Sequence, residues 1–81
     1  MDKDILLEII SKIHTTSMGI DRIKKNLKID ASDVVNYLID KIKNDKSKVY
    51  KNGKNFYIEI DNIIITINSY SYTIITAHIK K

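Results

Sequence analysis

The chain has 81 residues, no cysteine and a formal net charge of +4. Its length supports one small domain, and the lack of cysteine excludes a disulfide that would compensate for a small core. No apolar run reaches the roughly 18 residues of a membrane-spanning helix, and the N-terminus lacks the layout of a secretory signal. We therefore expect a single cytoplasmic domain, residues 1–81, that has no membrane partner.

The first half of the chain, residues 1–45, predicts three helices because its apolar residues recur at helical spacing. The first helix covers residues 3–14, the second follows the hydroxyl residues 15–17, and the third follows Asp30. Hydroxyl and aspartate side chains in these places are typical N-caps. Each helix then has one apolar stripe that can face a core. The stripes are Ile5, Leu6, Ile9, Ile10 and Ile13; Ile20, Ile23 and Leu27; and Val34, Val35, Leu38, Ile39 and Ile42.

The second half, residues 46–81, predicts an antiparallel meander of four strands because its apolar and polar residues alternate. Asn52-Gly53 is expected to form the first tight turn, and Asp61-Asn62 the second. Both turns place the large hydrophobic residues on one face of the sheet, which supports this register. The predicted strand pairs are Lys51 with Lys54, Val49 with Phe56, Ile58 with Ile65, and Ile60 with Ile63.

The last strand, residues 72–79, admits two arrangements. A three-residue loop before it turns Ile75, Ala77 and Ile79 toward the core, whereas a two-residue loop turns the alternate set, which includes Ile74, inward. We favour the three-residue loop because it buries the more apolar set. The prediction is an α+β domain with three N-terminal helices packed on one face of a four-stranded antiparallel β-meander. The open face would carry Lys48, Tyr50, Tyr57, Glu59, Thr66, Asn68, Tyr72, Thr76 and His78.

Cationic residues are concentrated in two segments, residues 22–28 and 41–54. The first segment holds four cations and no acid, and the second holds six lysines against one aspartate. Such a field attracts a polyanion, although a solvated lysine surface explains either segment alone equally well. Arg22 is the only arginine, and its planar guanidinium suits a phosphate group, with Lys25 at a neighbouring helical position.

The chain lacks paired carboxylates, clustered metal ligands and a glycine-rich phosphate loop, so we expect no metal and no cofactor. Histidine, tyrosine, threonine and cationic side chains remain, and these suit metal-independent cleavage of RNA. In that reaction a base removes the ribose 2′-hydroxyl proton, cations hold the phosphate, and an acid protonates the departing 5′-oxygen. We therefore predict a small RNA-engaging protein, with endoribonuclease activity of bacterial toxin type as the sharper hypothesis.

Each candidate residue has a role in this hypothesis and a plainer explanation. His78 is expected to be the general acid or base, with Tyr57 as base platform or proton relay and Thr76 as an orienting group. His14 is the alternative proton carrier, although the C-terminal end of the first helix would also favour a histidine there. A solvated histidine and ordinary strand tyrosines are the plainer explanations. The residues expected to bind nucleic acid are Arg22, Lys25, Lys48, Lys51, Lys54 and Tyr72.

Three segments resemble a small bacterial family catalogued only as a domain of unknown function, namely residues 13–27, 51–62 and 72–78. This resemblance covers nearly the whole chain and implies no activity. The order of helices, basic helical segment and four-stranded sheet also resembles the barnase, EndoU, colicin and RelE group of ribonuclease toxins. That resemblance implies that His14, which precedes a helix, acts on tRNA. In other members the catalytic groups lie on the sheet, which corresponds here to Tyr57, Thr76 and His78.

Two other classes of function stay open. One is a winged-helix DNA binder with the third helix in the major groove and the Asn52-Gly53 hairpin as the wing, although Asp33 and Asp40 make that helix acidic. The other is a protein-binding immunity or inhibitor factor of a mobile element, docking through the open face. The expected partners are thus RNA, including tRNA; a protein inhibitor or antitoxin; and a second copy that forms a homodimer through the open face.

Overall fold

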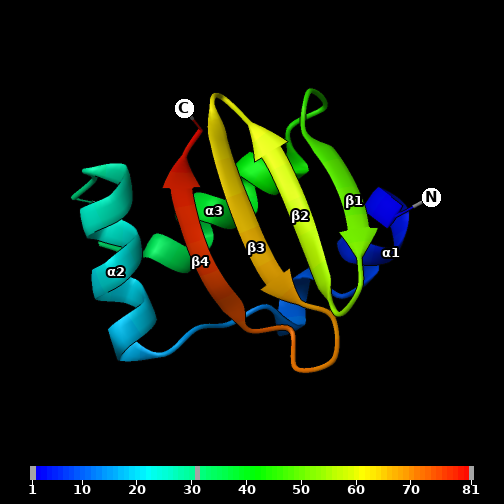
Figure 1. Cartoon of the computed structure of the whole chain (residues 1–81), viewed down its shortest axis with the longest axis horizontal. Helices are drawn as coiled ribbons and strands as arrows, with labels where there is room; N and C mark the ends of the chain where they lie inside the picture. Colours follow the sequence, from blue (N-terminus) through cyan, green and yellow to red (C-terminus); the bar gives the residue numbers. More distant parts are fainter. Residues whose placement is uncertain (1, 31, 81) are drawn as a thin grey trace.

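The computed structural model describes residues 2–30 and 32–80 (Figure 1). Three α-helices and one 3-10 helix precede four strands, which confirms the α+β class. The strands form one antiparallel sheet in the order β1-β2-β3-β4, so each strand pairs with its neighbour in the sequence, as the meander prediction requires. The elements are α1 (Asp2–Glu8), η1 (Ile10–Lys12), α2 (Ser17–Leu27), α3 (Val34–Lys43), β1 (Lys48–Asn52), β2 (Asn55–Ile60), β3 (Ile63–Asn68) and β4 (Ile74–Ile79).

One hydrophobic core draws side chains from all three α-helices and from β2, β3 and β4. Figure 1 shows α3 behind the sheet, α1 at the edge strand β1 and α2 alongside the other edge strand, β4, and α2 packs against β4 and α3. Each fully buried aliphatic side chain contributes about 1.5–3 kcal/mol, whereas an exposed ion pair contributes at most about 1 kcal/mol, so the core dominates stability. The largest fully buried side chains are Leu6, Ile23, Leu38, Ile42, Ile58, Ile65, Ile67 and Ile74.

The first helix is shorter than predicted, and His14 does not lie at its end. α1 ends at Glu8, a 3-10 turn follows, and His14 is in extended backbone beside β4. The His14 N–H donates to the Tyr72 carbonyl at 3.2 Å, and the Ile74 N–H donates to the His14 carbonyl at 2.7 Å. The predicted helix over residues 3–14 is confirmed as far as Glu8 and is wrong beyond it, because at His14 pairing with the sheet satisfies the backbone in place of helical hydrogen bonds.

The helix caps differ from the prediction at one of the two positions. Thr16, one of the three predicted candidates, caps α2, because its hydroxyl oxygen accepts from the Gly19 N–H at 3.0 Å. Asp33, not Asp30, caps α3, and its Oδ1 accepts from the Asn36 N–H at 3.1 Å. Only Asp33 stands directly before the first helical residue, where a carboxylate reaches the free N–H groups of the first turn.

The first hairpin is shifted by two residues from the predicted register. Its turn is Gly53-Lys54 and not Asn52-Gly53, so Lys51 faces Phe56 and Val49 faces Ile58. Gly53 has a φ of 64°, a conformation that glycine adopts without steric cost. Because strand side chains alternate with a period of two, this shift leaves every predicted β1 side chain on its predicted face. The pairs Ile58 with Ile65 and Ile60 with Ile63 are confirmed.

A β-bulge in β4 overturns part of the predicted final strand. Thr76 pairs with Thr66, but Ile74 pairs with Ile67, so Ile75 is an extra residue. Ile74 is therefore buried with 1% exposure, whereas Ile75 is 41% exposed. Ala77 is buried as predicted, but the predicted burial of Ile75 and Ile79 is wrong, and Ile79 is 42% exposed. The bulge lets one strand turn both Ile74 and Ala77 toward the core, a pattern that strict alternation excludes.

Candidate functional site

The side of the sheet opposite the buried strand residues is mostly polar. Its residues lie in three rows that cross the strands, because paired residues on neighbouring strands point to the same side. We call this surface the polar face. The rows are Lys48, Glu59, Ile64 and His78; Tyr50, Tyr57, Thr66 and Thr76; and Asn52, Asn55 and Asn68. Tyr72, predicted for this face, lies in the β3–β4 loop instead, with a φ of 60°.

Two tyrosines form a stacked pair in the middle row of the polar face. The ring centroids of Tyr50 and Tyr57 lie 5.5 Å apart with an interplanar angle of 22°, and Tyr50 is 43% exposed. The pair results from the register, which places these residues opposite each other on β1 and β2. The Asn55 side-chain amide donates to the Tyr57 hydroxyl at 3.4 Å. This arrangement presents an aromatic surface on which a further planar ring can stack.

A cleft of about 520 Å³ lies between the end of α2 and β4, and we call it the β4 cleft. Its volume falls within the roughly 300–1,000 Å³ of small-ligand sites. The Asn26 side-chain amide donates to the Thr76 hydroxyl at 3.4 Å and so connects the helix to the strand. Lys28 caps α2 in the left-handed conformation, with a φ of 55°. The residues lining this cleft are Asn26, Lys28, Thr76, His78 and Ile79.

The β4 cleft combines residues that sequence reasoning found with residues that it missed. Thr76 and His78 are predicted site residues, and the structure places them together because they are two apart on one strand. Asn26 and Lys28 were not predicted, although the basic segment over residues 22–28 contains both. Sequence periodicity shows which residues share an element, but it does not show that the end of α2 lies beside the end of β4.

None of the predicted cations lines this cleft. Arg22 is exposed and precedes Asn26 by one helical turn, so both lie on the same flank of α2, and Lys25 is exposed further around the helix. Lys48 shares a row with His78 but lies three strand spacings away, which is about 14 Å. Lys51 points to the side opposite the polar face, because it pairs with Phe56.

Tyr57 and Lys54 are also separated from the β4 cleft. Tyr57 lies on β2, two strands from Thr76 in the same row, so its hydroxyl does not join the cleft residues. Lys54 lies in the β1–β2 turn, at the end of the sheet opposite His78. The structure therefore divides the predicted site into the β4 cleft, with Thr76 and His78, and a separate tyrosine platform on the same face.

His14 lies at the other end of β4, within a chain of hydrogen bonds. Its Nδ1 lies 3.0 Å from the Lys12 carbonyl oxygen, and its Nε2 lies 3.1 Å from the Thr73 hydroxyl. The Ser71 hydroxyl donates to the Thr73 hydroxyl oxygen at 2.9 Å. Thr73 and His78 are five residues apart along the strand, or about 16 Å, so the two histidines do not form one acid–base pair. Sequence reasoning missed Lys12, Ser71 and Thr73.

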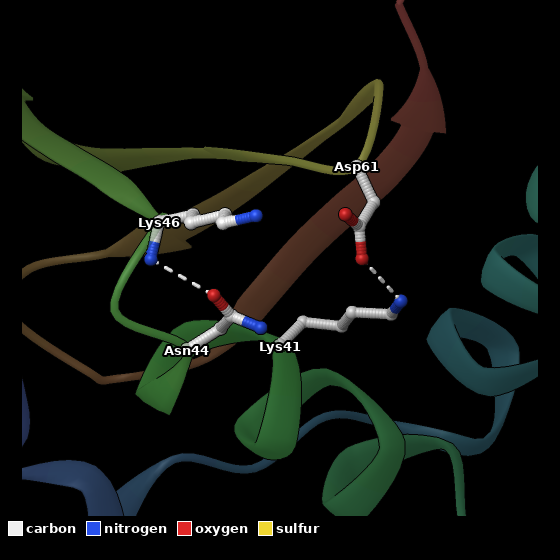
Figure 2. Close-up of polar contacts among 4 residues, drawn as sticks. All are labelled: Lys41, Asn44, Lys46 and Asp61. Atoms are coloured by element: carbon white, nitrogen blue, oxygen red, sulfur yellow. Dashed lines mark hydrogen bonds and ion pairs between the residues drawn. The ribbon is translucent and has the colours of Figure 1, made fainter.

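A smaller cavity of about 240 Å³ lies at the β2–β3 turn, among lysines and carboxylates. Lys41 donates to the Asp61 carboxylate at 2.7 Å, and Lys80 pairs with Glu59 at 3.0 Å. The hydrogen bond that Lys41 donates to Asp61 raises the pKa of the Lys41 ammonium. Figure 2 shows Lys41 reaching this turn from α3, and Lys46 extended toward the same turn. The cavity is lined by Lys46, Lys48, Glu59, Ile60, Asp61, Asn62, Ile63 and Lys80.

Residues 2–30 and 32–80, which the structure describes, hold neither a metal centre nor a membrane-spanning helix. No group of three histidine, aspartate or glutamate side chains among them is arranged to hold a metal ion. Within the same residues, no helix combines the length and the hydrophobicity that crossing a membrane requires.

Comparisons with known proteins give one match. No curated protein and no solved structure is significantly similar to the chain. The model of a family described as Protein of unknown function (DUF3781) matches residues 7–78. The chain belongs to this family.

Proposed function

We propose that this protein binds single-stranded RNA on the polar face. The observation that carries the proposal is the stacked pair of Tyr50 and Tyr57 on the same surface as the β4 cleft, whose lining includes Lys28. Unpaired bases stack on aromatic side chains, and cations beside such a platform hold the phosphates. The proposal takes α1 and α3 to lie on the core side of the sheet and α2 to lie beside its β4 edge, so that a polynucleotide has access to the polar face.

Charge and geometry support a single strand over a duplex. Arg22 and Lys28 lie on the α2 side of β4, whereas the tyrosine pair lies on β1 and β2. A strand whose backbone follows α2 can turn its bases across the sheet toward the tyrosines. In a duplex the bases are already paired and stacked, so the tyrosine pair would have no base face to contact.

Anisotropy titration of a labelled single-stranded RNA tests the tyrosine platform. The substitution Tyr57→Leu is expected to weaken RNA binding by about 1–3 kcal/mol, or roughly five- to 150-fold, because one base loses its stacking partner. Tyr70→Leu is the matched control, since Tyr70 is 72% exposed in the β3–β4 loop, away from the stacked pair. Equal affinity of all three proteins would contradict the proposed platform.

The same titration at several salt concentrations tests the cations. Lys28→Gln is expected to reduce the slope of log K against log salt concentration by about 0.7. The variant makes one phosphate contact fewer, so binding releases fewer counterions. Lys43→Gln on α3 removes the same charge from a helix behind the sheet and should leave the slope unchanged. Tighter binding to duplex DNA, lost when Lys51 and Lys54 are neutralised, would favour the DNA-binding alternative instead.

Cleavage of the bound RNA is the sharper form of the proposal, and the β4 cleft supports it. His78 Nδ1 or Nε2 would take the 2′-hydroxyl proton, the 2′-oxygen would bond to phosphorus, and the bond from phosphorus to the 5′-oxygen would break. Lys28 would hold the negative charge that grows on the phosphate, and a water molecule would protonate the 5′-oxygen. The products would be a 2′,3′-cyclic phosphate and a 5′-hydroxyl end.

Incubation with total bacterial RNA and with tRNA in EDTA tests this step. Wild-type protein is expected to create new 5′-hydroxyl ends that His78→Ala does not create, while both proteins bind RNA. Binding without cleavage would leave an RNA-binding protein. If the folded protein does not bind RNA, the polar face would instead bind a protein partner, such as an inhibitor or a second copy. Light scattering would then measure self-association.

A further inference from the structure

We propose that Thr73 is a nucleophile activated by His14, and that this pair accepts an acyl group from an activated carboxylic ester. The pair lies about 16 Å from His78, at the opposite end of β4, and does not depend on RNA binding. Three observations carry the proposal: the hydrogen-bond chain through the imidazole, the constrained loop that presents Thr73, and the ammonium group of Lys12 beside that loop.

The hydrogen bonds define the tautomer of His14. The Lys12 carbonyl oxygen can only accept, so the Nδ1 at 3.0 Å from it carries the proton in the neutral ring. The Nε2 is then an acceptor, and the Thr73 hydroxyl at 3.1 Å donates to it. A hydroxyl that donates to an imidazole, whose other nitrogen is held by a third group, is the arrangement of an activated nucleophile and its base.

Ser71 extends the chain to a second hydroxyl. Its single hydroxyl proton has two acceptors, the Thr73 hydroxyl oxygen at 2.9 Å and the Asn68 side-chain oxygen at 3.2 Å. Donation to the nearer oxygen, that of Thr73, would stabilise negative charge on it as the proton moves to His14. Ser71 and His14 are exposed and Thr73 is half-buried, so a substrate in solution can reach the chain.

The loop that presents Thr73 is constrained. Tyr72 has a φ of 60°, which is unfavourable for an aromatic residue and persists only where neighbouring contacts require it. The Tyr72 N–H donates to the Asn68 carbonyl at 2.9 Å, and the Tyr72 carbonyl accepts from His14. The Asn68 side-chain oxygen also accepts from the backbone N–H groups of Tyr70 and Ser71. These bonds hold the hydroxyl and the imidazole in place before a substrate binds.

The reaction is an acyl transfer to Thr73 followed by hydrolysis. The Thr73 oxygen bonds to the ester carbonyl carbon, the bond from that carbon to the alcohol oxygen breaks, and His14 moves the proton from Thr73 to the departing alcohol. Water then attacks the acyl carbon while His14 takes a proton from it, and the bond from that carbon to the Thr73 oxygen breaks. His14 returns the proton to the Thr73 oxygen, and the carboxylic acid leaves. Lys12, whose ammonium lies 5.9 Å from the Tyr72 ring centroid, favours an acyl group that carries negative charge.

Acetylation by 4-nitrophenyl acetate, mapped by peptide mass spectrometry after an acid quench, tests the nucleophile in the full chain. Thr73 is expected to be acetylated at least roughly tenfold faster than the exposed hydroxyl of Ser11, because its base lowers the barrier. The Thr73→Ser variant should still be acetylated at position 73, because serine supplies the same hydroxyl. Acetylation of the lysines proceeds without a base and serves as the internal control for reagent and exposure.

Variants at His14 separate catalysis from structure. His14→Gln can keep a hydrogen bond to Thr73 but cannot take a proton, so acetylation of Thr73 should fall roughly 100-fold while lysine acetylation stays constant. Equal labelling of Thr73 and Ser11 in wild-type protein would overturn the proposal without any variant. Unchanged labelling in folded His14→Gln would also overturn it and leave the hydrogen bond as a structural contact alone.

Discussion

Lys41 and Asp61 form an ion pair between the end of α3 and the β2–β3 turn (Figure 2). The hydrogen bond that Lys41 donates to Asp61 raises the pKa of Lys41 above its ordinary value of 10.5, and partial burial opposes this shift. A raised pKa in the folded state means that the protonated lysine stabilises the fold. This contribution is fully present below the unfolded pKa and is lost as the pH rises through the folded pKa.

Asp61→Asn is therefore expected to lower the free energy of unfolding at neutral pH by less than about 1 kcal/mol, because both side chains are partly exposed. Asparagine tolerates the φ of 49° at this position, so the turn should stay intact. Urea unfolding at neutral pH and above the folded pKa of Lys41 measures the effect. The difference between the two proteins should shrink at high pH, and a difference that persists there would show that the turn itself had changed.

At the level of elements, β4 is the strand whose structure departs most from its sequence pattern. Its bulge turns Ile74 and Ala77 inward and leaves Ile75 exposed. Strict alternation predicted that either the set with Ile74 or the set with Ala77 would face the core. In the structure one residue of each set does so, namely Ile74 and Ala77. The extra residue also aligns Thr76 with Thr66, which places Thr76 on the polar face next to α2.

Truncation of two adjacent isoleucines tests the bulge. Ile74→Ala should cost about 2–5 kcal/mol because it opens a cavity in the core. Ile75→Ala should cost less than about 1 kcal/mol because Ile75 is 41% exposed and lies outside the core. Denaturant unfolding of both variants measures the contrast. The opposite order of costs would mean that Ile75, and not Ile74, faces the core.

The N-cap of α3 gives a second element-level contrast between two aspartates. Asp33→Ala should lower the free energy of unfolding by about 1 kcal/mol, because the Asn36 N–H then loses its acceptor. Asp30 lies three residues earlier, outside the helix, so Asp30→Ala should change the free energy of unfolding by less than about 0.5 kcal/mol. Thermal or urea unfolding distinguishes them, and a larger loss for Asp30→Ala would place the start of the helix earlier.

Sequence reasoning identified the sheet because its signals are local. The Asp61-Asn62 turn and the alternation of β2 and β3 gave the observed pairs of Ile58 with Ile65 and Ile60 with Ile63. The predicted register of the first hairpin was wrong by two residues, but each side chain still lies on its predicted face, because side chains alternate with a period of two. The placement of His14 could not be found in this way, since its partner Thr73 lies far along the chain and no periodicity connects them.

The candidate site was only partly predictable for the same reason. Thr76 and His78 lie together because residues two apart in the regular part of a strand share a face. Their neighbours Asn26 and Lys28 come from another element, and only the packing of α2 against β4 brings them there. The expected group of Tyr57 with His78 fails because two strand spacings separate β2 from β4.

For the molecule as a whole, the sheet and the N-terminal half differ in how far their contacts reach along the sequence. Every strand pairs with its sequence neighbour, so β1 to β4 can form by successive local hairpins. The contact between His14 and Thr73 instead joins residues 59 positions apart. Closing that long loop costs chain entropy before it gains any contact, so local contacts should precede it.

The bridge between His14 and Thr73 therefore predicts an order of folding events. If it forms after the rate-limiting step, Thr73→Val should leave the folding rate nearly unchanged and should accelerate unfolding. Stopped-flow folding and unfolding in urea measure both rates, and a slower folding rate would place the bridge in the transition state instead. In the expected case, the segment that carries His14 would also be the first to detach from the native sheet, which makes this end of β4 the point where the fold opens.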